Sequence, residues 1–458
     1  MNIFKRLRNR SIKEIITISL IYLIGREKKN SDRFYAYFYE FALIKSYIKN
    51  LNIFSVYIKI KLNKLITNKF YNYNSKKKII LVTHSLSRGG AERQVVKLAN
   101  LLIKKKFNIQ ILLTNYDFKH TKNNSYINDL NKKIKINYIP KQENSIEYLK
   151  LSTFENKLNL NFLGAQDLYF VEAITKFLKF NKPYIVHSFL DGSNIVVGLA
   201  GLIAGVPKII LSLRNAAPWR WTFYISYWKE TYKFLQKFKN IKLVCNSSNN
   251  ARDYEKWLRI DNGSIKLTNN IFEFSKKIEK KKIFKKKIVF GTIARLAPEK
   301  RLFFMIKTFK LINNKNYKLK IVGTGYLNMR LKKYSRKLGL ENNVQFLGEI
   351  KNVENFLKKI DIFILTSYME GVPNVLLEAQ NSKIPIFSTN VGGVEESVIK
   401  NKSCYFISSE NSVKSSNKIK KLINKKNFFS GNEINLRKSK LKKFLPENVF
   451  KQMKKIYN

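Results

Sequence analysis

The sequence predicts an α/β protein with two domains, each built on a parallel β-sheet. Short apolar, β-branched runs alternate with helical stretches, and this alternation favours parallel strands joined by crossover helices. The chain has 458 residues, enough for two domains with sizeable cores. Its composition, 45% hydrophobic and 13% aromatic, is typical of a packed globular protein. The predicted strands are residues 79–83, 109–113, 134–139, 184–187, 208–213 and 241–245 in the first domain, and 288–294 and 360–365 in the second.

The chain is strongly basic. It has 88 Lys and Arg residues against 31 Asp and Glu, which gives a net charge of +57. A surplus of this size suits a nucleic-acid partner or an anionic membrane surface. A composition biased toward Lys, Asn and Ile produces the same surplus, because those residues also crowd the loops. The charge alone leaves these three interpretations open.

Two cysteines occur, Cys245 and Cys404, and each lies in an apolar run. Two buried thiols suit a reducing compartment better than a disulfide framework, so we expect a cytoplasmic protein. No cluster of Cys and His residues has the spacing of a structural metal site.

Residues 1–75 are predicted to form a basic extension rich in tyrosine and phenylalanine. Its apolar run at residues 15–24 is about half as long as a bilayer span. No small-residue cleavage site follows this run, which disfavours a secretory signal. We expect either a helical arm that lies on the cytoplasmic leaflet of a membrane or helices that pack on the catalytic body or on a second subunit.

The first domain is predicted at residues 76–272, with polar and glycine residues where its strands end. Gly89 and Gly90 lie between the first strand and the first helix, where a glycine pair lets the backbone approach a ligand closely. His187 ends a later strand, at the edge where open parallel sheets bind ligands. It either contacts a substrate or is a histidine at the sheet edge whose hydrogen-bonding groups are satisfied within the protein. Arg214 follows the next strand and either pairs with an acceptor phosphate or is an ordinary solvated arginine.

A basic linker is predicted at residues 273–287, and a second domain at residues 288–434. The first strand of this domain is followed by Arg295 and Lys300, which lie five residues apart across the turn into the next helix. Both side chains can converge on one diphosphate, because arginine supplies a planar fork and lysine a compact charge. A basic helix is predicted at residues 435–458.

The stretch that organises the site follows the strand predicted at residues 360–365. Glu370 and Gly371 form a turn, and Pro373 suits the first turn of a helix, where its missing N–H costs nothing. The unpaired backbone N–H groups at such a helix start favour an anion. Glu370 lies ahead of this helix start and Glu378 about one turn inside it. One ligand can therefore contact both carboxylates, which accept hydrogen bonds from sugar hydroxyls.

Residues 370–379, Glu-Gly-Val-Pro-Asn-Val-Leu-Leu-Glu-Ala, resemble the donor-site motif of the retaining family 4 glycosyltransferases. Those enzymes have the GT-B fold, in which two Rossmann-like domains with parallel sheets face each other across a cleft. The resemblance covers about residues 79–400, with its motifs in the expected order. The matching segments are residues 89–96, 295–300, 319–325, 344–348 and 370–379.

The sequence also departs from the family pattern. Phe189 stands where the family often has a second histidine, which weakens the prediction of a catalytic role for His187. Ala294 and Arg301 replace the outer glycines of the family's Gly-Arg-Leu-x-x-Glu-Lys-Gly signature. Lys383 replaces a glycine at a helix end, a change expected to affect stability more than chemistry.

The resemblance implies a role for each matching residue. The expected catalytic residues are Glu370, which would hold the hydroxyls of the donor sugar, and Arg295 and Lys300, which would offset the charge of the leaving diphosphate. Glu378 would hold the ribose hydroxyls. No Asp-x-Asp motif occurs, so we expect no metal and no cofactor. The other expected donor-binding residues are Gly371, Val372, Pro373, Asn374, Gly323 and Gly325. The expected phosphate and acceptor residues are Gly89, Gly90, His187 and Arg214.

The predicted function is that of a retaining glycosyltransferase. Its expected partners are a nucleotide-sugar donor, with a UDP-sugar favoured, a lipid-linked or cell-surface glycan acceptor of polysaccharide or lipopolysaccharide synthesis, and an anionic membrane surface. No nucleic-acid partner is expected, and the expected location is the cytoplasm, peripheral on the cytoplasmic face of the inner membrane. The alternatives are another two-domain sugar enzyme, such as a nucleotide-sugar epimerase or a phosphorylase, and a polyanion-binding protein. Against the last, the sequence has no recognisable nucleic-acid module.

Overall fold

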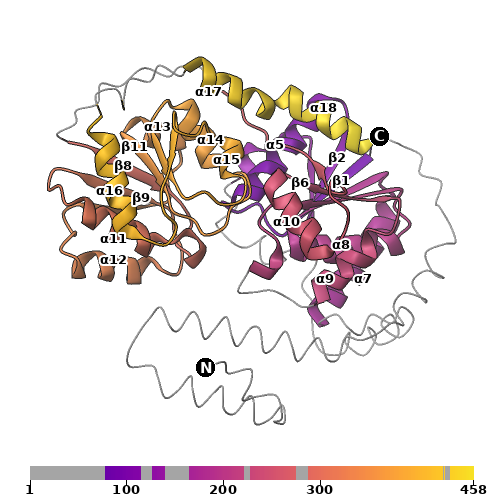
Figure 1. Ribbon diagram of the computed structural model, residues 1–458. Helices are drawn as coiled ribbons and strands as arrows, with labels where there is room; N and C mark the ends of the chain where they lie inside the picture. The colour runs from indigo at the N-terminus through magenta and orange to yellow at the C-terminus, as the bar shows by residue number, and fades with distance from the viewer. Residues whose placement is uncertain are drawn as a thin grey trace, which may run out of the picture.

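The computed structural model describes residues 78–114, 126–139, 165–220, 227–274, 287–425, 428 and 434–458. Within these residues the chain forms two α/β domains that lie side by side (Figure 1), each with a parallel sheet, as the sequence predicts. The predicted membrane or packing arm at residues 1–75 lies outside the described residues, as does most of the linker predicted at residues 273–287.

The first domain has a seven-stranded sheet in the order β3-β2-β1-β4-β5-β6-β7. Every strand pair is parallel. The order reverses between β1 and β4, and ligands bind outside the carboxyl ends of the strands at such a reversal. The strands are β1 (Lys78–Thr83), β2 (Asn108–Leu113), β3 (Lys135–Tyr138), β4 (Ile185–Phe189), β5 (Lys208–Leu213), β6 (Ile241–Cys245) and β7 (Lys266–Leu267).

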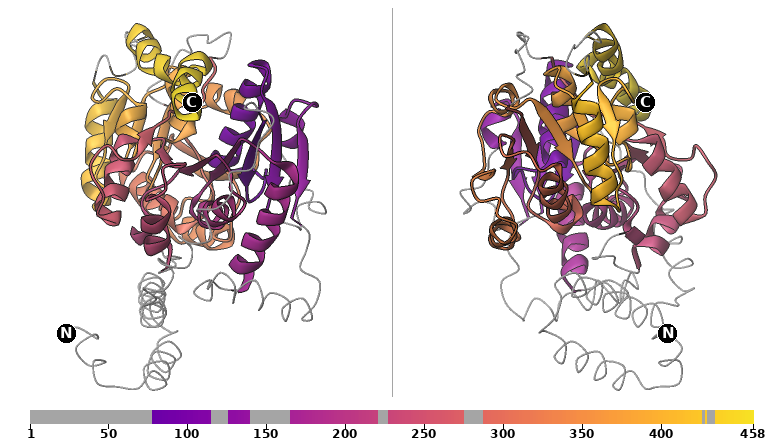
Figure 2. Two further views of the ribbon diagram at one scale, coloured as in Figure 1. Left: turned by 90° about the vertical axis from the view of Figure 1, so that its right-hand side faces the viewer. Right: turned by 60° about the vertical axis from the view of Figure 1, so that its left-hand side comes forward.

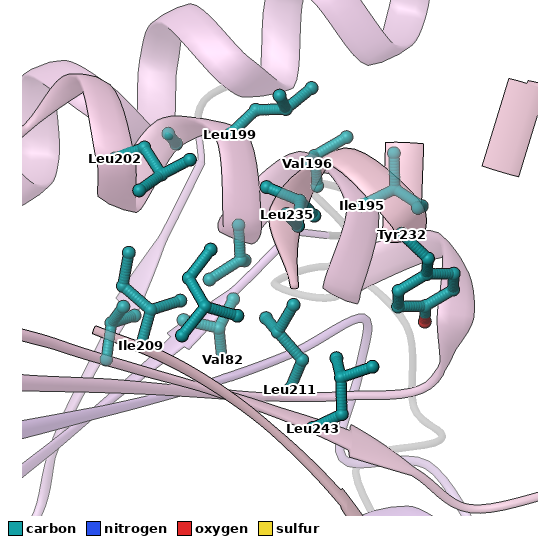
Figure 3. Close-up of a cluster of buried hydrophobic side chains, with 14 of the residues drawn as sticks. Val82, Ile195, Val196, Leu199, Leu202, Ile209, Leu211, Tyr232, Leu235 and Leu243 are labelled. Atoms are coloured by element: carbon teal, nitrogen blue, oxygen red, sulfur yellow. The ribbon is translucent and has the colours of Figure 1, made fainter. Parts of the chain in front are cut away.

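Helices cover both faces of this sheet, so its central strands are buried on both sides. Figure 3 shows one of the two cores, in which Val82 and Leu211 from the strands face Leu199 and Leu235 from the helices. Each such side chain contributes about 1.5–3 kcal/mol when fully buried. The helices of this domain are α5 (Gly90–Lys104), α7 (Ala165–Asn181), α8 (Asp191–Ile203), α9 (Tyr227–Leu235) and α10 (Ser248–Leu258).

The second domain repeats this plan with a six-stranded parallel sheet in the order β10-β9-β8-β11-β12-β13. Here the order reverses between β8 and β11, which places the binding edge at the ends of these two strands. The strands are β8 (Val289–Ile293), β9 (Lys318–Val322), β10 (Val344–Gly348), β11 (Ile362–Leu365), β12 (Ile386–Ser388) and β13 (Cys404–Phe406). The helices are α11 (Leu302–Ile312), α12 (Asn328–Lys337), α13 (Val353–Lys358), α14 (Asn374–Asn381), α15 (Val394–Ser397) and α16 (Ser412–Ile423).

The C-terminal segment crosses from the second domain back to the first (Figure 1). Helix α17 (Ile434–Leu441) lies beside α14 of the second domain, where Arg437 donates to the carbonyl of Ile384 at 3.0 Å. Helix α18 (Pro446–Tyr457) then completes the second core of the first domain with Met453 and Ile456. Both helices lie at the top of the molecule in the further views (Figure 2). The last helices therefore contact both domains.

Two of the departures from the family pattern lie at left-handed backbone positions. The φ angle is 49° at Arg301, which precedes α11, and 59° at Lys383, which follows α14. Glycine adopts this conformation without steric cost, whereas other residues are strained there by about 1–2 kcal/mol. The family's preference for glycine at these two positions thus has a backbone cause.

Candidate active site

Glu370 and Lys300 meet at the carboxyl edge of the second sheet. Glu370 lies in the loop between β11 and α14, and Lys300 ends the short 3-10 helix η4 (Pro298–Lys300) that follows β8. Lys300 Nζ is 2.6 Å from Glu370 Oε1, and the two side chains are 20% and 11% exposed. The hydroxyl of Ser367 donates to the same carboxylate oxygen at 2.6 Å. The pair lies where the strand order reverses, which is the binding position of this type of sheet.

Glu378 lies one turn into α14, and its two oxygens have different surroundings. The helix begins at Asn374, with Pro373 as its N-cap residue rather than in its first turn. Glu378 Oε1 is 2.6 Å from Arg93 NH1 of the first domain. Its Oε2 is buried and has no hydrogen-bond partner among the described residues. A buried acceptor of this kind is costly to leave unpaired, so it suits a hydroxyl donated by a ligand.

Arg295 pairs with a neighbour instead of joining Glu370 and Lys300. Its NH2 is 2.5 Å from Glu299 Oε1, and its side chain is 69% exposed. An exposed pair of this kind contributes little free energy, so the guanidinium is weakly held. Burial raises the pKa of Glu92 in the first domain, and the positive charge of Arg295 partly offsets this rise. Arg295 and Lys300 thus have different partners in this structure, and their convergence on one diphosphate stays a prediction.

Gly323 and Gly325 allow the loop after β9 to lie against the loop that carries Arg295. The φ angle of Gly323 is 126°, and a Cβ there would come within 2.0 Å of the carbonyl oxygen of Ala294. A Cβ on Gly325 would lie 2.5 Å from the carbonyl oxygen of Leu296. In this structure the two predicted donor-binding glycines therefore set the packing of two loops at the binding edge.

The loop before α14 is held by hydrogen bonds from the first domain. Asn270 donates to the carbonyl of Val372 at 2.9 Å and to Asn374 Oδ1 at 2.8 Å. Gln94 of α5 donates to the same oxygen at 3.0 Å. The amide nitrogen of Asn374 in turn donates to the carbonyl of Gly90 at 3.1 Å. Asn374, predicted to bind the donor, has its side-chain amide engaged between the two domains.

Two further glycines mark close approaches in the same region. A Cβ on Gly371 would lie 2.2 Å from the carbonyl oxygen of Arg214, so the loop of the second domain lies directly on the first domain. A Cβ on Gly89 would lie 1.9 Å from Glu92 Oε2, because that carboxylate folds over the glycine loop. Residues larger than glycine do not fit either position without rearrangement.

His187 and Arg214 lie in a buried polar network. His187 is fully buried, with Nδ1 2.8 Å from the hydroxyl of Tyr457 and Nε2 2.7 Å from the hydroxyl of Ser212. Arg214 is 9% exposed and donates to Asn270 Oδ1 at 3.2 Å. His187 is thus fully buried with both ring nitrogens paired, so the ring has no nitrogen left for a substrate in this structure. Arg214 supports Asn270, which holds the loop before α14, and is not a solvated arginine.

Burial also sets the charge states in this network. It lowers the pKa of His187 well below the usual value, and the positive charge of Arg214 lowers it further. Burial lowers the pKa of Arg214 to about 10. Phe189 stacks on the His187 ring with centroids 4.4 Å apart. The guanidinium of Arg214 lies over the Phe189 ring, 5.0 Å from its centroid. Phe189 thus fills the position of the family's second histidine with an apolar packing contact.

The first-domain residues that hold the second domain were not predicted from the sequence. Arg93 and Gln94 belong to the matched segment after the glycine pair, but their partners lie far along the chain, at Glu378 and Asn374. Asn270 lies three residues before the predicted linker and belongs to no motif. The one available signal was the run of polar residues directly after Gly89 and Gly90 at the start of a helix.

Comparison with known proteins agrees with this architecture. Residues 273–438 match the family described as glycosyl transferases group 1. A Methanocaldococcus jannaschii protein named uncharacterized glycosyltransferase MJ1059 is 31% identical over 236 residues, which are 47% of this chain and 58% of that protein. A Campylobacter jejuni protein is 27% identical over 77% of this chain and 90% of its own length. It is named GalNAc-alpha-(1->4)-GalNAc-alpha-(1->3)-diNAcBac-PP-undecaprenol alpha-1,4-N-acetyl-D-galactosaminyltransferase.

A solved structure shares the fold. The crystal structure of Anabaena Alr3699/HepE in complex with UDP and glucose matches with a TM-score of 0.66 and 17% identity, over 83% of this chain and 98% of that chain. The predicted GT-B fold is thereby confirmed. The chain thus shares the fold of this structure, and residues 273–438 are similar to the group 1 glycosyl transferases. The chain spans little more than half, 58%, of the archaeal relative.

The described residues contain neither a candidate membrane span nor a candidate metal site. None of the helices in the described ranges is long and apolar enough to cross a membrane. In the same part of the chain, no group of three or more His, Cys, Asp and Glu side chains is arranged to hold a metal ion. The expectation that the protein needs no metal stays a prediction.

Proposed function

We propose that this protein is a retaining glycosyltransferase that moves a sugar from a nucleotide-sugar donor to a glycan acceptor. The observation that carries the proposal is the arrangement around α14. Glu370 pairs with Lys300 at 2.6 Å, and one turn into the helix Glu378 has a buried oxygen without a partner among the described residues. A nucleotide sugar needs a cation for its diphosphate and acceptors for its hydroxyls, and this arrangement supplies both.

Lys300 has the main electrostatic role in the proposed reaction. As the bond from the anomeric carbon to the diphosphate breaks, negative charge grows on the leaving group, and Lys300 offsets it. Arg295 reaches the same diphosphate by rotating away from Glu299, which holds it only weakly. Groups that stabilise charge more strongly in the transition state than in the ground state lower the barrier. Because cationic side chains supply this compensation, we propose that the reaction proceeds without a metal ion.

The stereochemical course is proposed to be retention by attack on the same face from which the diphosphate leaves. The acceptor oxygen bonds to the anomeric carbon, and the leaving phosphate helps to take the acceptor proton. Support comes from Glu370, whose Oε1 accepts from both Lys300 and Ser367. A carboxylate held in this way suits the binding of hydroxyls better than nucleophilic attack.

The proposed substrates are a UDP-sugar and a lipid-linked or cell-surface glycan of polysaccharide or lipopolysaccharide synthesis. The names of the Campylobacter relative and of the Anabaena complex support this choice. The net charge of +57 favours peripheral binding to an anionic membrane. We propose that this membrane is the cytoplasmic face of the inner membrane and that nucleic acid is not a partner.

The test of the proposal offers the full chain a panel of UDP-, GDP- and ADP-sugars with undecaprenyl-diphosphate-linked acceptor glycans. Products are followed by mass spectrometry, and the new anomeric linkage is assigned by NMR. We expect transfer from a UDP-sugar, with the donor's anomeric configuration kept and with the same rate after EDTA treatment. Loss of transfer with EDTA would refute metal independence, and an inverted linkage would refute retention.

A matched pair of variants links this activity to the site. Glu370→Gln should lower turnover by about 100-fold or more, because the carboxylate contacts both the sugar and Lys300. Lys105→Gln removes a surface ion pair to Glu447 at 2.9 Å and should turn over like the wild type. Near-normal turnover of Glu370→Gln, with an unchanged circular dichroism spectrum, would show that the site lies elsewhere.

A further inference from the structure

The two domains are joined by an ion pair that involves the donor site itself. Arg93 lies on α5 of the first domain, and its NH1 is 2.6 Å from Glu378 Oε1 on α14 of the second domain. The two side chains are 29% and 11% exposed, so the pair is largely shielded from solvent. Ion pairs in such surroundings have well-defined geometry and interact more strongly than exposed ones.

The electrostatic surroundings of Arg93 favour its charged form. Burial lowers its pKa, but the carboxylate of Glu378, the hydroxyl of Tyr126 and the charge of Asp129 outweigh this effect and raise it. The next residue along α5, Gln94, donates to Asn374 at the start of α14. The first turn of α5 is therefore docked on the first turns of α14 at two adjacent points.

This docking leaves Glu378 with one oxygen fixed and one oxygen available. Oε1 is taken by Arg93, and Oε2 is buried with no partner among the described residues. An ionised carboxylate only accepts hydrogen bonds, so a hydroxyl is the natural partner of Oε2. Without Arg93, Glu378 would be able to rotate, and the direction of its second oxygen would no longer be set.

We propose that Arg93 is a positioning residue of the donor site, supplied by the opposite domain. It holds Glu378 so that Oε2 accepts a hydrogen bond from the ribose 2′-hydroxyl of the nucleotide. Recognition of the ribose then depends on contact between the two domains. This inference rests on the proposed function, because it takes the ligand of Glu378 to be a ribonucleotide.

The test measures how well the full chain distinguishes a ribonucleotide from its 2′-deoxy form. Isothermal titration calorimetry gives the affinity for whichever of UDP, GDP and ADP binds the wild type most tightly, and for the matching 2′-deoxynucleoside diphosphate. A hydrogen bond to a charged group makes the ribonucleotide bind roughly 10- to 100-fold more tightly in the wild type. We expect Arg93→Gln to reduce this ratio to within about 3-fold of unity and Arg93→Lys to give an intermediate ratio.

Arg88→Gln is the matched comparison. Arg88 also links the domains, with NH1 3.4 Å from Glu349 Oε2 and a hydrogen bond of 2.8 Å to the carbonyl of Ile350, but it does not contact Glu378. Its loss should leave the ribose-to-deoxyribose ratio unchanged. The double variant Arg93→Gln/Glu378→Gln should have the same ratio as Glu378→Gln alone, because Arg93 acts only through Glu378.

The outcomes separate failure of this inference from failure of the proposed function. If Glu378→Gln loses the discrimination and Arg93→Gln keeps it, the inference is wrong and the donor-site assignment stands. If Arg93→Gln and Arg88→Gln lower the ribose-to-deoxyribose ratio equally, the cause is weaker contact between the domains in general. That result also overturns the inference. If the wild type binds none of the nucleotides, or Glu378→Gln discriminates as the wild type does, the donor-site assignment itself fails.

Discussion

At His187 the surroundings of a single ring decide its protonation. The imidazole lies between the hydroxyls of Tyr457 and Ser212, is fully buried, and has the cation of Arg214 nearby. A proton on this ring would place a second positive charge in a fully buried site. The pKa of His187 is therefore lowered well below its usual value, and the ring is neutral at pH 7.

This charge state predicts a pH dependence of stability. In the unfolded chain a histidine is protonated as the pH falls below about 6.5, whereas folded His187 stays neutral to a lower pH. The unfolded state thus binds the proton first, so the stability from this group is present above about pH 6.5 and is lost as the pH falls. Compared with the wild type, His187→Gln should show a shallower fall in the free energy of unfolding between about pH 7.5 and 5, measured by urea denaturation. Parallel curves would mean that folded His187 titrates normally.

Individual site residues differed in how well the sequence predicted them. The pairing of Glu370 with Lys300 was predictable in kind, because both follow strands of one sheet whose carboxyl ends meet at one edge. Arg93 was not, because its role depends on how the two domains dock, and no local pattern encodes that contact. Arg214 was predictable as a residue that follows a strand of the first sheet, but its burial beside Asn270 was not.

Among the secondary-structure elements, α14 shows how a helix end can be strained. The helix ends at Asn381, and Lys383 takes a φ of 59° so that the chain can turn into β12. Glycine is the usual residue at such a C-terminal turn because it has no Cβ. The lysine at this position thus stores strain in the backbone.

Relieving this strain should stabilise the second domain. Lys383→Gly should raise the free energy of unfolding by about 0.5–1 kcal/mol, the excess of the strain over the added flexibility of glycine in the unfolded chain. Lys402→Gly is a suitable control, because Lys402 also lies in a turn but does not have a positive φ. That variant should be slightly less stable than the wild type by thermal unfolding. A loss of stability in Lys383→Gly would show that the lysine side chain outweighs the strain.

Most elements were predictable from apolar periodicity, and the exceptions have a physical reason. The strands β1 and β5 are buried after their first lysine and are largely apolar. By contrast, β7 has two exposed residues, which show no pattern at all. The site loop before α14 was predicted as a turn, but its conformation depends on hydrogen bonds from the other domain.

At the scale of the whole molecule, the C-terminal helices return from the second domain to the first. Helix α17 lies on the second domain, and α18 inserts Val449, Met453 and Ile456 into a core of the first domain. Lys242 and Lys208 of the first sheet donate to the last carbonyls of α18, at 2.9 Å from Lys242 to Ile456 and 2.8 Å from Lys208 to Tyr457. The first domain therefore depends on residues that follow the second domain in the sequence.

This dependence is testable with one buried and one exposed position on α18. Met453 is 1% exposed, so Met453→Ala should lower the stability of the first domain by about 2–5 kcal/mol. Lys454→Ala, on the exposed side of the same helix, should change it by less than about 0.5 kcal/mol. All four tryptophans lie between residues 219 and 257, so tryptophan fluorescence during denaturation reports on the first domain alone. Equal midpoints for the two variants would show that α18 packs more loosely than the structure indicates.

The return of α18 also has a consequence for the order of events during synthesis. A nascent chain is expected to begin folding its earlier domain while the ribosome is still translating the later one. Here one face of the first sheet stays partly uncovered until residues 446–457 have emerged, because Val449, Met453, Ile456 and Tyr457 fill it. The first domain is therefore translated first but completes its core last. A nascent chain that stalls before α18 exposes the apolar face of the first sheet to chaperones.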